Sequence, residues 1–174
     1  MNATQAAGLL AFGCAGISCF MAARPRLWQA LGWCHAALCA ELLLGLRHRL
    51  HDRADSALRD AQAYEGRGDW QWILLAVAVG VGVFFGIAIY GRIARGGGRS
   101  LTVATLLSLM ALMLFVMETI SLHSVDALLY RQFDGLMVIG WLWLMTGGAV
   151  SVCALSSRAG VSSRGPGSRR KKRR

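Results

Sequence analysis

The chain has 174 residues, of which 55% are hydrophobic and only 16% are charged. A soluble domain of this length needs more polar surface, so the composition favours a membrane protein. The formal net charge is +10, but eight of the nineteen Lys and Arg residues lie in residues 158–174, which contain no acid. The basic character therefore belongs to a tail. No nucleic-acid-binding motif accompanies it, and we expect no specific nucleic-acid partner.

Five apolar stretches follow one another, each close to the roughly 20 residues that cross a bilayer. We expect spans at about residues 4–23, 28–46, 71–91, 101–120 and 136–155. The sequence therefore predicts an all-α bundle of five transmembrane helices in one domain, residues 1–157, followed by a disordered basic tail, residues 158–174. The first stretch lacks the basic start of a signal peptide, which favours a retained span.

The basic residues between the spans predict the orientation. Arg24 and Arg26, then Arg92, Arg95 and Arg99, and finally the tail all fall on one side of a five-span protein. Cytoplasmic loops carry an excess of Lys and Arg, so we expect the N-terminus outside and the C-terminus in the cytoplasm. We expect the tail to bind anionic lipid headgroups, through Arg169, Arg170, Lys171, Lys172, Arg173 and Arg174.

Residues 47–69 differ sharply from the spans on either side. Five arginines balance five acids there, and Leu50, Ala54, Leu58 and Ala61 recur at helical spacing. This pattern predicts that the second helix continues beyond the membrane as an amphipathic segment in an extracytoplasmic loop. We expect Gly66 and Gly68 to end this segment before the third span.

Polar residues gather where the fourth span ends. Residues 101–117 carry no charge, and at about 1.5 Å per residue Glu118 lies about 25 Å along the helix, near the outer boundary. The end of the second helix, the 47–69 loop and the start of the third helix are expected on the same side. The candidate polar cluster comprises Glu41, Arg47, Tyr64, Arg67, Gln71, Glu118, Ser121, His123 and Asp126.

Two interpretations of this cluster stay open. In the first, Arg47 and Arg67 pair with nearby carboxylates and fix the loop against the fourth helix, in a non-catalytic accessory or small-ligand-binding protein. In the second, Glu118, His123 and Asp126 serve a metal-dependent membrane hydrolase or transferase. Whether the protein is an enzyme is left open, and the sequence names no cofactor. A membrane-protein partner or a homo-oligomer fits either interpretation.

Short motifs within residues 28–150 resemble a group of uncharacterised multi-pass bacterial inner-membrane proteins. The resemblance rests on Glu41…Arg47, on Tyr64-Glu-Gly-Arg67 with Gln71, and on Ser121-Leu-His123-Ser-Val-Asp126. These match an E…R helix end, a Y–x–x–R–x–x–x–Q loop and an S–x–H–x–x–D segment before the last span. The resemblance implies a plasma-membrane location and about five helices, and it implies no activity.

Overall fold

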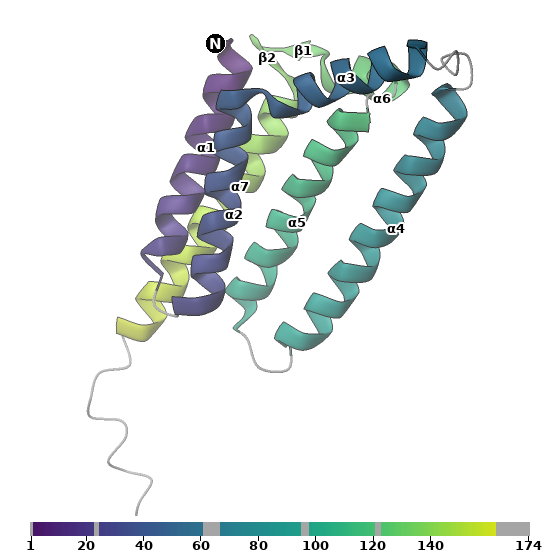
Figure 1. The fold of residues 1–174 in the computed structure, drawn as a ribbon. Coiled ribbons are helices and arrows are strands. Elements are labelled where there is room, and N and C mark those ends of the chain that lie inside the picture. The colour runs from purple at the N-terminus through teal and green to yellow at the C-terminus, as the bar shows by residue number, and fades with distance from the viewer. Residues whose placement is uncertain (1, 23–24, 61–66, 95–97, 121–122, 163–174) are drawn as a thin grey trace, which may run out of the picture.

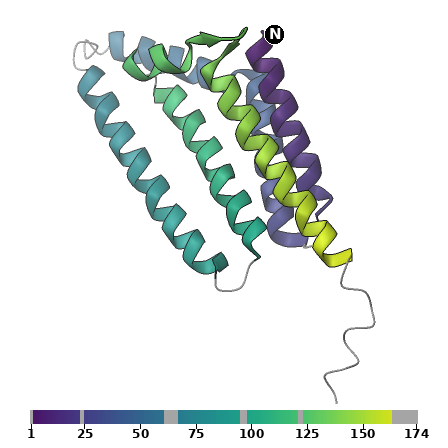
Figure 2. The same cartoon turned by 180° about the vertical axis from the view of Figure 1, so that it is seen from behind.

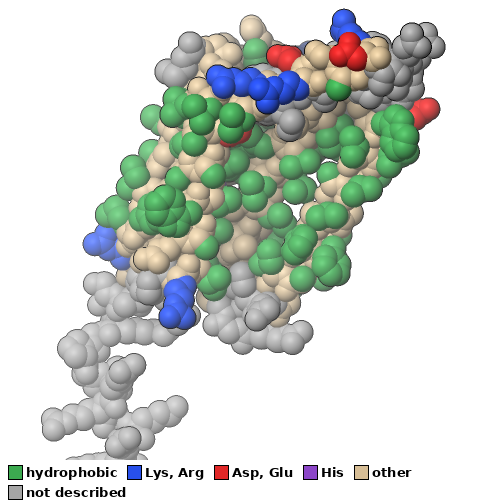
Figure 3. Space-filling view, in the orientation of Figure 1, with side chains coloured by type: hydrophobic (Ala, Val, Ile, Leu, Met, Phe, Trp, Pro, Cys, Tyr) green, Lys and Arg blue, Asp and Glu red, His purple; other side chains and the backbone are tan. Residues whose placement is uncertain are grey.

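The computed structural model describes residues 2–22, 25–60, 67–94, 98–120 and 123–162. Five of its helices are long and apolar enough to cross a membrane: α1 (Ala3–Phe20), α2 (Pro25–Leu44), α4 (Arg67–Ala94), α5 (Arg99–Ile120) and α7 (Val138–Ser162). The predicted all-α bundle with five membrane-spanning helices is confirmed. On the face drawn in Figure 3, apolar side chains cover the flank of the bundle, and charged side chains lie at its two ends.

Two short helices and a hairpin cover one end of the bundle. Helices α3 (Leu46–Asp60) and α6 (His123–Leu129) lie there with the antiparallel strands β1 (Gln132–Phe133) and β2 (Leu136–Met137), beside the N-terminus (Figure 1). We call this the hairpin end, and the opposite end, where α7 stops, the tail end. Asp134 and Gly135 both adopt positive φ in the two-residue turn, as a tight hairpin with right-twisted strands requires.

The prediction that the second helix continues beyond the membrane is corrected, because α2 ends at Leu44 and a separate helix, α3, begins at Leu46. The segment is helical, as its periodicity indicates, but it is not in line with α2. Gly45 has φ of +61°, a left-handed conformation that ends α2 and that glycine adopts without steric cost. Helix α3 consequently lies across the hairpin end (Figure 1).

The observed helix boundaries shift at three other places. Helix α4 already begins at Arg67, so Gly68 belongs to the span and does not precede it. Pro25 is the first residue of α2, where its missing N–H has no helical partner to lose. Helix α7 begins at Val138, after the hairpin, and continues to Ser162, five residues beyond the predicted domain boundary.

Helix α1 is the centre of the packing. It lies between α2 and α7, α5 packs against α7, and α4 packs mainly against α5 (Figures 1 and 2). Glycines allow the closest approach, because a Cβ built at Gly147 of α7 would lie 2.6 Å from the carbonyl oxygen of Ala11 in α1. Small residues at helix contacts are the usual means of packing in membranes, where apolar burial gives little driving force.

The buried core divides into two apolar clusters with a polar contact near their boundary. The cluster toward the hairpin end includes Phe12, Phe115 and Trp143, and the cluster toward the tail end includes Trp28 and Val150. All five cysteines are free thiols. The aromatic rings of the first cluster form the floor under the hairpin end, where the candidate site lies.

Candidate functional site

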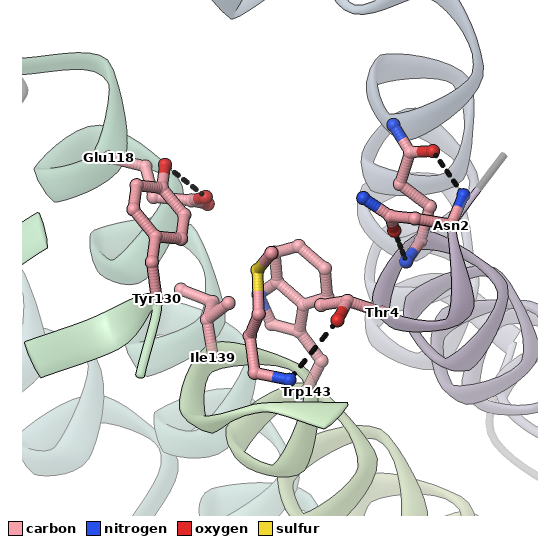
Figure 4. Close-up of a pocket in the computed structure, with 8 residues that line it drawn as sticks. Asn2, Thr4, Glu118, Tyr130, Ile139 and Trp143 are labelled. Atoms are coloured by element: carbon pink, nitrogen blue, oxygen red, sulfur yellow. Dashed lines mark hydrogen bonds between the residues drawn. The ribbon is translucent and has the colours of Figure 1, made fainter. Parts of the chain in front are cut away.

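A pocket of about 380 Å³ opens at the hairpin end, between the first and last helices (Figure 4). Three of its residues come from the start of α1 and two from the start of α7. The others come from the end of α5, the segment after α6, and β2. The lining residues are Asn2, Thr4, Gln5, Glu118, Tyr130, Met137, Ile139 and Trp143.

The start of α1 is held in place by two local contacts. The Asn2 side chain accepts a hydrogen bond from the Gln5 N–H (2.8 Å), and the Gln5 side chain accepts one from the Asn2 N–H (3.1 Å). This reciprocal capping box satisfies two N–H groups that the first turn cannot bond internally. The Thr4 hydroxyl in turn accepts a hydrogen bond from the Met137 N–H (3.2 Å), which fixes β2 beside α1.

The floor of the pocket is apolar. Ile139 and Trp143 are four residues apart on α7, so they share one face of the helix, and each is only 1% exposed. The Trp143 ring stacks on Phe115, with ring centroids 5.5 Å apart, and lies 6.1 Å from Phe12. A rigid aromatic base therefore closes the pocket toward the bundle interior.

The one charged group of the lining, among the residues that the structure describes, is Glu118. Its side chain belongs to the last turn of α5 and is only 6% exposed. The Tyr130 hydroxyl donates a hydrogen bond to Glu118 Oε1 (3.1 Å), so the phenol ring lies beside the carboxylate (Figure 4). The pocket thus combines a buried carboxyl group, aromatic rings and neutral hydrogen-bonding side chains.

The predicted polar cluster is only partly described. Among the side chains of the cluster that the structure describes, Glu118 lines this pocket. Glu41 in α2 and Asp126 in α6 are half-buried toward the same end, and Gln71 of α4 donates a hydrogen bond to the Ile120 carbonyl at the end of α5 (3.1 Å). Tyr64 and Ser121 lie outside the described residues, as do the side chains of Arg47, Arg67 and His123.

The metal-dependent alternative gains no support from the described part of the chain. No group of three His, Cys, Asp or Glu side chains there could hold a metal ion. The proposed ligand set Glu118, His123 and Asp126 includes His123, whose side chain is outside that part. The contact between Glu118 and Tyr130 does not need a metal to account for it.

Most of the pocket was missed by sequence reasoning. The Asn2-x-x-Gln5 spacing is a recognisable capping box and could have indicated a fixed helix start. Nothing in the sequence, however, places that start beside Tyr130 and Trp143, more than 120 positions away. The pocket depends on the pairing of the first helix with the last.

A second polar contact lies inside the bundle. His35 of α2 is fully buried, stacks on Phe12 and approaches the Ser108 hydroxyl of α5, with Nε2 and Oγ 3.0 Å apart. Because the Ser108 hydroxyl donates to the Ala104 carbonyl (2.8 Å), its oxygen must accept from an Nε2–H of His35. His35, which stands alone in the sequence of its span, thus joins two helices.

Comparison with known proteins assigns no family to this chain. No family model, curated protein or solved structure matches it. The functional argument therefore depends on the residues and on the geometry of the pocket.

Proposed function

We propose that this protein is a non-catalytic, multi-pass membrane protein that binds a small ligand in the pocket at its hairpin end. The observation that carries the proposal is the buried carboxyl group of Glu118 in a cavity with an apolar aromatic floor. Ligand sites in proteins are usually concave and mostly apolar, with a few placed polar groups. Asn2, Gln5 and Tyr130 supply such groups here, and Ile139 and Trp143 supply the floor.

Binding is favoured over catalysis because the lining offers few reactive groups. In the described lining only Glu118 and Tyr130 have side chains that titrate, and they are hydrogen-bonded to each other. General acid–base chemistry or nucleophilic catalysis needs a base, an acid or an activated nucleophile around one reacting atom. Thr4, which supplies the aliphatic hydroxyl of the described lining, instead accepts the hydrogen bond from the Met137 N–H.

We further propose that the pocket opens outside the cytoplasm, in a bacterial inner membrane. The motif resemblance supports this membrane, and the charge distribution supports the orientation. Arg26, Arg99 and Arg158 lie at the tail-end termini of α2, α5 and α7, whereas the described acids lie toward the hairpin end. A C-terminal green fluorescent protein fusion should fluoresce, and a C-terminal alkaline phosphatase fusion should be inactive. The opposite pair of results contradicts this orientation.

A pair of substitutions on one strand tests ligand binding. In Met137→Trp the larger side chain should fill the pocket, whereas Leu136→Trp changes the neighbouring residue, which does not line it. Adjacent strand residues point to opposite faces, so the second variant is a matched control. A library of small cations, anions, zwitterions and neutral compounds would be screened by thermal shift on the purified protein.

The proposal expects a defined class of compounds to raise the melting temperature of the wild type and of Leu136→Trp, but not that of Met137→Trp. A library with no such class, or equal shifts in both variants, would contradict ligand binding in this pocket. The screen does not assume which class of compound binds.

A further inference from the structure

The hairpin of β1 and β2 carries a strongly exposed apolar side chain. Phe133 is 69% exposed, a fraction that no large hydrophobic side chain among the described residues exceeds. We propose that this hairpin is a membrane-surface anchor, with the Phe133 ring inserted where the headgroups and acyl chains of the nearer lipid leaflet meet. This inference does not depend on the ligand of the pocket.

The exposed residues of α7 define the side of this helix that faces lipid. They recur at intervals of four and three residues, so they lie along one side of the helix, and they are Trp141, Met145, Gly148, Val152 and Leu155. The opposite side is buried in the two apolar clusters. Because α7 is long and apolar enough to cross a membrane, its exposed side contacts acyl chains there. Trp141 is the member of this side nearest to the hairpin.

The length of α7 places Trp141 near a membrane boundary. The Arg158 side chain is exposed, and a charged group is costly in hydrocarbon, so Arg158 marks the boundary at the tail end. Trp141 precedes it by 17 residues. This separation corresponds to about 25 Å along a helix, against a hydrocarbon thickness of about 30 Å. Tryptophan is enriched where the hydrocarbon meets the headgroups.

A hydrogen bond brings Phe133 to the same depth. The Trp141 indole N–H donates to the Phe133 carbonyl oxygen (3.0 Å), so the hairpin lies against the lipid-facing side of α7. Figure 2 shows the hairpin at the start of this helix. A single exposed phenylalanine on a soluble domain would need no explanation. Here the exposed ring extends the apolar side of a membrane-spanning helix, and this continuity indicates lipid as what covers it.

The backbone of the hairpin is suited to a place with little water. The Val138 N–H donates to the Arg131 carbonyl (3.0 Å), and the Met137 N–H donates to the Thr4 hydroxyl (3.2 Å). The Phe133 carbonyl oxygen is bonded by the Trp141 indole. A backbone N–H or C=O without a partner is costly where lipid replaces water. These three bonds therefore lower the cost of bringing the hairpin to the membrane surface.

Polar neighbours limit the depth of the hairpin. The side chains of Arg131, Gln132 and Asp134 are exposed on either side of Phe133. Charged groups are stable among hydrated headgroups but not among acyl chains, so the hairpin rests on the leaflet and only the Phe133 ring enters it. Since β2 supplies Met137 to the pocket, this contact also holds one wall of the pocket at the membrane surface.

Photo-crosslinking identifies what covers Phe133. The amino acid p-benzoylphenylalanine bonds to nearby C–H groups on illumination, and it would replace one residue at a time in the full-length protein, in liposomes of phosphatidylethanolamine and phosphatidylglycerol. Phe84 of α4 is the lipid-facing reference, because it is also a phenylalanine and is 68% exposed on an apolar helix. Ser56 of α3 is the water-facing reference, since it is exposed on a helix face with Asp52 and Asp60.

Mass spectrometry of the intact protein would measure the fraction joined to lipid. Position 133 should give at least half the lipid adduct of position 84 and at least fivefold that of position 56. A smaller yield at position 133 overturns the anchor. A product at position 133 that is mainly a covalent dimer shows that a second copy of this chain covers the hairpin, and it overturns the anchor as well.

Hydroxyl-radical footprinting of the unmodified protein is a second test, which needs no substitution. The radicals form in water and oxidise the phenylalanine rings that water reaches. Phe133 and Phe84 have nearly equal exposed fractions, so their oxidation rates in the same liposomes should agree within threefold if lipid covers both rings. Oxidation of Phe133 more than threefold faster than that of Phe84 would place the ring in water and overturn the anchor.

Discussion

Helices α1 and α4 occupy opposite extremes of this bundle. Helix α4 has the highest mean hydropathy of the five spans, yet only 6% of its apolar window is buried, against 44% for α1. Its tryptophan, phenylalanine and isoleucine side chains are exposed on the flank of the bundle, among them Trp72, Phe84 and Ile87. In a membrane such a surface faces lipid, which is as apolar as the side chains, so hydropathy alone does not identify the packed helix.

The two helices also differ in how they use glycine. Gly8 of α1 and Gly140 and Gly147 of α7 are buried, and a Cβ added there would lie within 3.0 Å of the Trp143 ring, the Thr4 side chain or the Ala11 backbone, respectively. Gly82 of α4 instead faces the flexible side chain of Met113 in α5. A groove of about 270 Å³ lies beside this contact, between α4 and α5. At Gly147 an added methyl group would force the backbones of α1 and α7 apart, whereas at Gly82 the Met113 side chain can move to make room for it.

The largest effect is expected at the contact between α1 and α7. In Gly147→Ala the added Cβ would lie 2.6 Å from the Ala11 carbonyl oxygen, so two helix backbones must move apart. We expect the free energy of unfolding in mixed detergent micelles to fall by about 2 kcal/mol, in the range known for overpacked cores. The adjacent Gly148→Ala meets no atom within 4 Å and should change stability little. Equal effects of the two substitutions would contradict the close packing of these helices.

A smaller loss is expected at the polar contact between His35 of α2 and Ser108 of α5. Ser108→Ala removes the acceptor of the His35 Nε2–H and leaves a buried donor without a partner. A loss of about 1 kcal/mol in the free energy of unfolding is expected, since membrane hydrogen bonds average about 0.6 and leaving a buried donor unpaired adds to this.

The control for this contact lies one turn earlier on α5. Thr105→Ala removes a hydroxyl that donates to the Leu101 carbonyl of its own helix (2.8 Å), so no contact between helices is lost. This variant should lose less stability than Ser108→Ala. If both variants lose the same amount, the contact between His35 and Ser108 does not stabilise the bundle.

The contact between Gly82 of α4 and Met113 of α5 should tolerate a glycine-to-alanine substitution better than the contact between Gly147 and Ala11. In Gly82→Ala the new Cβ would lie 2.5 Å from Met113 Sδ, but the methionine side chain can rotate away. We expect a loss below about 1 kcal/mol, against near zero for Gly80→Ala, whose Cβ meets no atom within 4 Å. Both would be measured in the same micelles. A loss as large as that of Gly147→Ala would show that α4 is as tightly held as α1.

The sequence predicts the helices far better than their partners. Uninterrupted apolar stretches of about 20 residues are sufficient to identify the five spans, because bilayer thickness imposes that length. Which helices touch depends on small residues that face each other across long sequence separations, as Gly147 and Ala11 do. The bend at Gly45 likewise depends on one backbone conformation, which the amphipathic pattern on either side does not reveal.

In the candidate site, too, some residues can be predicted from the sequence and others cannot. Glu118 is conspicuous in the sequence because a carboxylate near hydrocarbon must be paired, protonated or directed inward, and the structure buries its side chain against Tyr130. Asn2, Thr4 and Trp143 carry no such signal. They reach the same pocket only because α1 packs against α7 and the hairpin brings Met137 back to Thr4.

The smallest expected effect concerns the attachment of α4 at the hairpin end. The Gln71 amide donates to the Ile120 carbonyl, which has no helical partner at the end of α5. Gln71→Leu removes this bond, and we expect a loss of only about 0.5 kcal/mol in the free energy of unfolding, because one membrane hydrogen bond contributes little.

Hydrogen exchange is the sensitive measurement, since it detects local opening that barely changes global stability. Backbone amides in the first turns of α4 should exchange faster in Gln71→Leu, whereas those of α1 should not change. Gln29→Leu, which replaces an exposed glutamine of α2, is the matched control and should leave both helices unchanged. Faster exchange in α1 as well would mean that α4 supports the whole bundle, and the contrast between a tightly packed α1 and a loosely packed α4 would then be wrong.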